Sequence, residues 1–110
     1  MLHVSSNPLG DAGVAALAKA LPPTLEQLFV CGVGCGDDGF VALAAALPAL
    51  TRLRDLRIAF NRDVGARGWA ALVGALPSLP ALEYIYAASN SAEVAALAAA
   101  RREGLRIVGV

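Results

Sequence analysis

Charged and aromatic residues are both scarce in this sequence, and its charges cancel. Nine Lys and Arg side chains balance nine Asp and Glu side chains in 110 residues, so the formal net charge is zero. No basic stripe indicates a nucleic-acid surface, and no acidic tail is present. We therefore expect no nucleic acid among the partners of this chain.

Cysteine and histidine are equally rare. Two cysteines, Cys31 and Cys35, are too few for a disulfide framework. With His3 as the one histidine, they also provide too few ligands for a structural zinc site. The first residues have neither the basic start nor the apolar stretch of a signal peptide. We expect an intracellular, cytoplasmic setting, with no metal and no cofactor.

Long apolar runs are missing, although 57% of the residues are hydrophobic. Alanine and leucine supply most of that share, and aromatics make up only 5%. This composition suggests closely packed helices, and we expect no membrane partner. Charged residues interrupt every candidate run, among them Lys19, Asp37, Asp38, Arg52, Arg54 and Asp63.

The sequence contains an internal repeat instead. Gly13, Gly39 and Gly68 stand at equivalent positions, at steps of 26 and 29 residues. Apolar residues with i, i+3, i+4, i+7 spacing follow each glycine, and the same spacing occurs once more near the C-terminus, which predicts four helices. The four stripes are Val14, Leu17, Ala18 and Leu21; Phe40, Leu43, Ala44 and Leu47; Trp69, Leu72, Val73 and Leu76; and Val94, Leu97, Ala98 and Arg101.

Short segments with a period of two alternate with these helices and predict strands. The sequence therefore divides into strand–helix units at 1–24, 25–52, 53–81 and 82–104, followed by a terminal strand at 105–110. No such unit buries its apolar face alone, so we expect the units to stack. The inward pairs are Leu2 and Val4, Leu28 and Val30, Leu56 and Ile58, Ile85 and Ala87, and Leu105 and Ile107.

The helix starts carry capping signals. Asp11 and Asp37 stand where a side-chain oxygen can cap the helix that each one begins. Asn90 or Ser91 can do the same for the fourth helix, with Glu93 completing a capping box. Ala66 takes the place of the aspartate in the third unit, so we expect a weaker cap there.

These residues resemble the ribonuclease-inhibitor type of leucine-rich repeat. The resemblance rests on Leu25, Leu28 and Val30, then Gly36-Asp37-x-Gly39, then Leu43-Ala44-x-Ala46-Leu47, and it covers essentially the whole chain. Its other segments are Leu2-x-Val4-x-x-Asn7-x-Leu9-Gly10-Asp11-x-Gly13 and Leu53-x-x-Leu56-x-Ile58-x-x-Asn61. It implies an α/β solenoid with a parallel sheet on the concave face and helices on the convex face, and a protein partner bound on the sheet.

The chain departs from this family pattern at several points. Val33 replaces the usual Asn or Cys, and the fourth unit lacks the Gly-Asp-x-Gly turn. The family's proteins usually have more repeats, so we expect a fragment of a longer array. Its first strand, without a covering neighbour, indicates the alternative function: a structural segment of a longer repeat array, or a self-associating module, with no separate ligand.

The outward strand residues are the candidate binding site. One row is His3, Phe29, Arg57, Tyr86 and Arg106, and a second is Gln27, Asp55 and Tyr84; beyond the strands come Ser5, Ser6, Cys31, Ala59, Phe60 and Ser89. Exposed aromatics around an arginine are typical of an interface hot spot. The residues that we predict to bind a partner are Phe29, Arg57, Tyr84, Tyr86, Gln27, Asp55 and Phe60. The alternative is that Arg57 stacks on Phe29 or Tyr86 and the patch only covers the sheet.

An enzymatic function is the remote alternative. Gly34, Gly36 and Gly39 match a dinucleotide-binding G-x-G-x-x-G, and Asp55 follows at about the expected distance. The turn recurs in the other units, however, and the repeat explains it without a ligand. Cys35 aligns with the apolar Leu9 and is predicted to be buried, whereas Cys31 is predicted on the outward face, with no base beside it. We therefore expect no catalytic residues.

Overall fold

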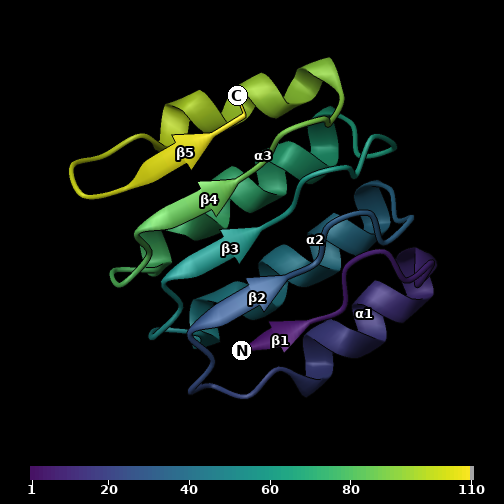
Figure 1. Cartoon of the computed structure of the whole chain (residues 1–110), viewed down its shortest axis with the longest axis horizontal. Helices are drawn as coiled ribbons and strands as arrows, with labels where there is room; N and C mark the ends of the chain where they lie inside the picture. The colour runs from purple at the N-terminus through teal and green to yellow at the C-terminus, as the bar shows by residue number, and fades with distance from the viewer. Residues whose placement is uncertain (110) are drawn as a thin grey trace.

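Five short strands form one parallel sheet, in the order β1-β2-β3-β4-β5 (Figure 1). The computed structural model describes residues 1–109. The predicted strand at 105–110 is observed over Arg106–Val108, and residue 110 lies outside the described residues. The strands are β1 (Leu2–His3), β2 (Gln27–Phe29), β3 (Asp55–Arg57), β4 (Tyr84–Tyr86) and β5 (Arg106–Val108).

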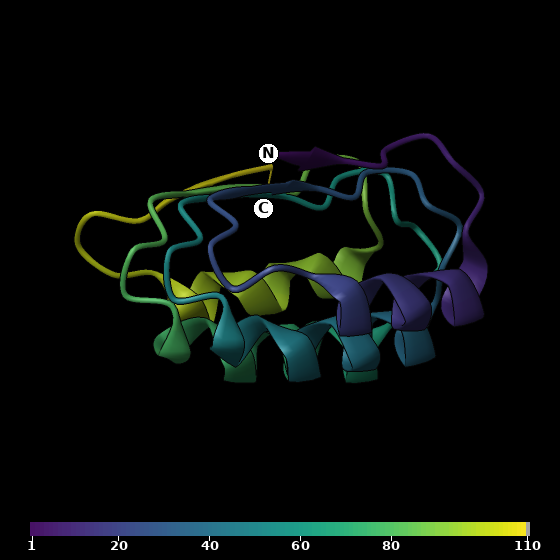
Figure 2. The same ribbon diagram turned by 90° about the horizontal axis from the view of Figure 1, so that it is seen from below.

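The helices all cover one face of this sheet and leave the other face free of helices (Figure 2). Each helix follows a strand, so the α/β class is confirmed for the part of the chain that the structure describes. Within residues 1–109, no helix is both long enough and apolar enough to span a membrane. The helices are α1 (Gly10–Ala20), α2 (Asp37–Ala46) and α3 (Ala66–Ala75), with the 3₁₀ segments η1 (Leu47–Ala49), η2 (Leu76–Ser78) and η3 (Ala92–Ala100).

The core lies between the sheet and the helix layer. Phe40 of α2 and Trp69 of α3 are fully buried, and their rings meet edge to face with centroids 5.0 Å apart. The Trp69 indole N–H donates to the Val64 carbonyl oxygen at 3.2 Å, so its one polar group is satisfied. In α1, Val14 is buried but Leu17 is only half-buried, because α2 covers α1 on one flank.

The fourth helix differs from the prediction. It is a 3₁₀ helix, in which residues three apart share a face, so Val94, Leu97 and Ala100 turn toward the core. The predicted inward residues Ala98 and Arg101 are exposed. Only 19 residues separate β4 from β5, against 26 between β3 and β4. A 3₁₀ helix rises about 2.0 Å per residue against about 1.5 Å in an α-helix, so it spans the sheet with fewer residues.

The predicted capping of each helix by its own aspartate is wrong. Asp11 Oδ1 accepts hydrogen bonds from the Gly36 and Gly39 amides at the start of α2, both at 2.8 Å. Stacking places this carboxylate of one unit over the first turn of the next. A Cβ on Gly39 would lie 2.9 Å from Asp11 Oδ1, so glycine is needed for this approach.

The next unit repeats the arrangement. Asp37 Oδ1 accepts from the Gly65 and Gly68 amides at the start of α3, at 2.7 and 3.0 Å. Ala66 therefore does not weaken the cap of α3, because that cap comes from the preceding unit. Ser91 does not cap η3, since its hydroxyl donates to the Val64 carbonyl oxygen at 2.6 Å.

Two asparagines, the buried Asn61 and the half-buried Asn90, link the ends of neighbouring strands. The Asn61 amide group donates to the carbonyl oxygens of Val30 and Ile58 at 2.9 and 3.0 Å, and its Oδ1 accepts from the Val33 amide at 3.1 Å. Asn90 was predicted as a helix cap. Its side-chain amide group instead donates to the carbonyl oxygens of Ile58 and Ala87, and its Oδ1 accepts from the backbone N–H of Asn61 at 2.6 Å. Each asparagine thus satisfies backbone groups of two neighbouring units.

Candidate binding face

The helix-free side of the sheet gathers the residues predicted to bind a partner. Cα pairing places Phe29 beside Arg57 and Arg57 beside Tyr86, and it places Asp55 beside Tyr84. Gln27 pairs with Asp55 at the start of the second row. Six of the seven predicted residues therefore form two adjacent rows on β2, β3 and β4. We call this surface, together with Phe60, the open sheet face.

The last strand enters these rows in a different register from the one predicted. Tyr84 pairs with Arg106 and Tyr86 pairs with Val108, so Arg106 belongs to the second row. The reason is that the Leu105 amide donates to the Arg102 carbonyl oxygen and closes the turn before β5. Leu105 is therefore in the turn, and Ile107 is the residue that pairs with Ile85. Ile107 thus occupies the place beside Ile85 that the predicted inward pairs gave to Leu105.

Arg57 contacts three other side chains of the open sheet face, those of Asp55, Phe29 and Tyr84. Its Nε and one terminal nitrogen donate to the two carboxylate oxygens of Asp55, each at 3.1 Å. Its guanidinium carbon lies 4.5 Å from the ring centroid of Phe29 and 5.4 Å from that of Tyr84. The alternative interpretation predicted stacking of Arg57 on Phe29 or Tyr86; the stacking on Phe29 is observed, and the second ring is that of Tyr84. Such contacts are each worth about 0.5–2 kcal/mol where they are partly desolvated.

The ion pair gives this centre a defined electrostatic character. The hydrogen bond to Asp55 raises the pKa of Arg57 above its ordinary value. The Asp55 side chain is 15% exposed and the Arg57 side chain 41% exposed, so the ion pair is only partly shielded from solvent. Arg57 therefore packs against the rings of Phe29 and Tyr84 while its charge is paired with that of Asp55.

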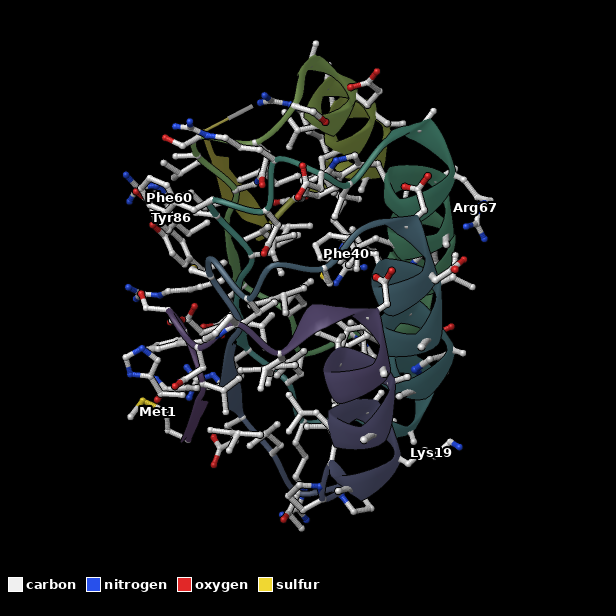
Figure 3. The ribbon with its side chains drawn as sticks, turned by 90° about the vertical axis from the view of Figure 1, so that its right-hand side faces the viewer. Met1, Lys19, Phe40, Phe60, Arg67 and Tyr86 are labelled. Carbon is white, nitrogen blue, oxygen red and sulfur yellow. The ribbon has the colours of Figure 1, made fainter. Side chains whose placement is uncertain are left out.

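Phe60 lies just beyond β3 and is 51% exposed, more than any other Phe, Tyr or Trp among the described residues. Figure 3 shows Phe60 and Tyr86 projecting from the sheet side, away from the helices that carry Lys19 and Arg67. Ala59, which was predicted on the outward surface, is fully buried instead. Its burial leaves Phe60 as the aromatic residue at this end of the open sheet face.

Sequence reasoning missed a charged border at the start of the strands. Arg54 lies 3.9 Å from Glu26 and 3.1 Å from Glu83, and all three side chains are more than half exposed. They border an open hollow of about 450 Å³ that Asp55 and Tyr84 also line. The signal was present, because a charged residue immediately precedes each of β2, β3 and β4. Exposed pairs of this kind contribute about 0–1 kcal/mol each.

The cysteines occupy different environments. Cys35 is 1% exposed, and burial, followed by the charge of Asp11, raises the pKa of its thiol to about 11. Cys31 is half-buried on the sheet side, and its amide donates to the Ser5 hydroxyl oxygen at 3.0 Å. Among residues 1–109, no group of three or more His, Cys, Asp or Glu side chains could hold a metal ion.

The glycines that resemble a dinucleotide site serve the cap of α2. The amides of Gly36 and Gly39, which would have to face a phosphate, both donate to Asp11. An anion would have to displace this carboxylate before it reached the start of the helix.

In comparisons with known proteins, no family model and no curated protein matches this chain.

Proposed function

We propose that this chain is a protein-interaction module of the leucine-rich-repeat type, a curved solenoid that binds a protein partner on the open sheet face. The observation that carries the proposal is the cluster of Phe29, Tyr84 and Tyr86 around the Asp55-paired Arg57 on the side of the sheet without helices. The helix layer already supplies the core, so these rings are not needed to fill it.

The repeat supports the solenoid part of this proposal. Equivalent residues pair across successive strands, and the aspartate of one unit caps the helix of the next. Contacts of this kind between nearest neighbours are what hold solenoid proteins together. A rigid sheet that presents aromatic side chains binds with little loss of conformational entropy.

The test is a selection from a displayed library of random twelve-residue peptides, with the wild-type chain as bait. We expect the enriched peptides to lose binding to the double variant Phe29→Ala/Tyr86→Ala. They should keep binding to Lys19→Ala, whose change lies on the helix side. Circular dichroism melts would show that the double variant remains folded, because Phe29 and Tyr86 are only half-buried. Peptides that bind the double variant as well as the wild type would refute the proposed face.

Self-association through the first unit is the second candidate. Within the described residues, β1 pairs only with β2, and Leu2, Val4, Leu9, Leu17 and Leu21 at this end of the sheet are only half-buried. An open edge strand beside apolar side chains favours pairing with another strand.

The variant His3→Pro tests this second candidate. The Val4 amide donates to Phe29 in the β1–β2 ladder, so the amide of its neighbour His3 points to the open edge. Proline at position 3 removes that donor and keeps the ladder. Light scattering should show a wild-type dimer and a monomeric His3→Pro variant. A monomeric wild type at all concentrations would contradict this candidate.

A further inference from the structure

Charge is distributed unevenly along the strands of the open sheet face. The carboxylates on this side, those of Glu26, Asp55 and Glu83, all lie where a strand begins. The segments that run from the strands toward the helix starts contain no Asp or Glu, and these segments are 2–10, 28–36, 56–62 and 84–92. Their cationic side chains are those of Arg57 and Arg62. The strand ends therefore provide positive charge and no acidic residue of their own.

Arg62 is the unpaired cation at these strand ends. Its side chain is exposed, and its Nε donates to the carbonyl oxygen of Ser89 at 3.3 Å. The backbone amide of Phe60 donates to the carbonyl oxygen of Ala88 at 3.0 Å, so Phe60 and Arg62 contact adjacent residues just beyond β4. Within residues 1–109, Arg62 forms no ion pair, and its two terminal nitrogens have no acceptor.

The carboxylate next to Arg62 in the sequence belongs to Asp63, and it lies near the start of α2. The pKa of the buried Cys35 thiol is raised first by burial and then by the charges of Asp11 and Asp63. The Asp63 carbonyl oxygen would lie 3.5 Å from a Cβ on Gly36, the residue before α2. No ion pair joins Asp63 to Arg62 among the described residues. The charge of Arg62 is therefore not matched by its neighbour.

Arg57 adds a second cation that is only partly compensated. Asp55 accepts from Nε and from one terminal nitrogen of Arg57, and the other terminal nitrogen has no acceptor within residues 1–109. Cα pairing places Arg57 beside Tyr86, two residues before the Ala88 carbonyl oxygen that Phe60 contacts. Two guanidinium groups and two aromatic rings thus belong to the same end of the face. Such a surface is complementary in charge to carboxylates.

We propose that the partner segment is acidic, and that Arg62 and the remaining terminal nitrogen of Arg57 bind its carboxylates at the strand ends of the open sheet face. This inference rests on the proposed function. Guanidinium groups bind carboxylates through two parallel N–H donors, which suits the terminal nitrogens of Arg62. Apolar groups of the same segment pack against Phe60 and Tyr86, at the same end of the face.

The experiment uses the peptides enriched from the displayed library, selected at low salt. We expect Asp and Glu to be more frequent in them than in the unselected library. Arg62→Gln should weaken their binding about tenfold, because a charge-assisted contact is lost. Replacing the shared acidic residue of a peptide by Asn or Gln should weaken its binding to the wild type to a similar extent. The two changes together should cost less than the sum of both, because they remove the same contact.

Matched variants separate charge from structure. Arg67→Gln removes an equal charge on the helix side, where Arg67 pairs with Asp38, and it should leave peptide affinity unchanged (Figure 3). Arg62→Lys keeps the charge but loses the Nε bond to Ser89, and its affinity should stay within about threefold of the wild type. Raising the salt concentration from about 50 to about 500 mM should weaken binding to the wild type more than binding to Arg62→Gln.

The outcomes distinguish this inference from the proposed function. Peptides that Phe29→Ala/Tyr86→Ala no longer binds, but that share no carboxylate and bind Arg62→Gln as tightly as the wild type, would overturn the acidic partner and leave the proposed function standing. Equal losses for Arg62→Gln and Arg62→Lys, with unchanged salt dependence, would reduce Arg62 to a structural role and also overturn it. A selection that enriches no peptide sensitive to Phe29→Ala/Tyr86→Ala would count against both.

Discussion

Replacing Asn61 by alanine should destabilise the protein more than any other single removal of a polar side chain. Asn61 is 2% exposed and makes three side-chain hydrogen bonds to backbone groups. In Asn61→Ala, the Val33 amide and the Val30 carbonyl oxygen lose this partner in the core. Ile58 keeps a second donor, the side-chain amide of Asn90 at 3.1 Å.

The magnitude follows from the groups left unpaired. Each buried backbone group without a partner costs about 1–3 kcal/mol, and two such groups are created. We therefore expect the free energy of unfolding to fall by about 4 kcal/mol. Asn7→Ala is the matched control, because Asn7 is exposed and donates to Val4 and Ser5 carbonyl oxygens at 3.0 and 3.3 Å. Water can replace these bonds, so this variant should lose less than about 1 kcal/mol.

Urea unfolding followed by circular dichroism measures both variants. The midpoint should shift strongly for Asn61→Ala and little for Asn7→Ala, with the same slope m in each case. The variant Asn61→Asp adds a second criterion, because it places a carboxylate beside the Val30 and Ile58 carbonyl oxygens. Its stability should rise as the pH falls and the acid becomes neutral. Equal losses for the two alanine variants would refute the assignment of Asn61 as the central polar link between units.

The remaining predictions concern the helix caps and the thiols. Asp37→Ala should lower the free energy of unfolding by about 1–2 kcal/mol, because it removes the cap of α3. Hydrogen exchange should show faster exchange of the Gly65 and Gly68 amides at the start of α3. Faster exchange at the start of α2 instead would contradict capping of the following helix. At pH 8 an alkylating reagent should modify Cys31 in the folded protein and both cysteines in denaturant, because burial raises the Cys35 pKa to about 11. Rapid alkylation of folded Cys35 at pH 8 would disprove its burial. The free energy of unfolding should also fall as the pH rises from about 9 to 11, because the Cys35 thiol ionises at a lower pH in the unfolded chain than in the folded protein.

The periodicity of the sequence predicted most of the fold. Alternating apolar pairs such as Leu28 and Val30, and stripes such as that from Phe40 to Leu47, depend only on which side of an element is buried. Both are buried as predicted. The open sheet face was predictable for the same reason, because the neighbours of inward strand residues point outward. Phe29, Arg57 and Tyr86 therefore lie in the expected row.

The packing of one unit against the next decided what periodicity could not. Asp11 stands beside its own helix in the sequence, but its carboxylate caps α2, because stacking brings it to Gly39. Only the position of Asp55 shows that the charge of Arg57 is already paired. The sequence by itself determined the repeat and the face that carries the aromatics. Tertiary structure determined the capping partners, the register of β5 and the positive φ angle of Phe60, because each depends on contacts between residues of different units.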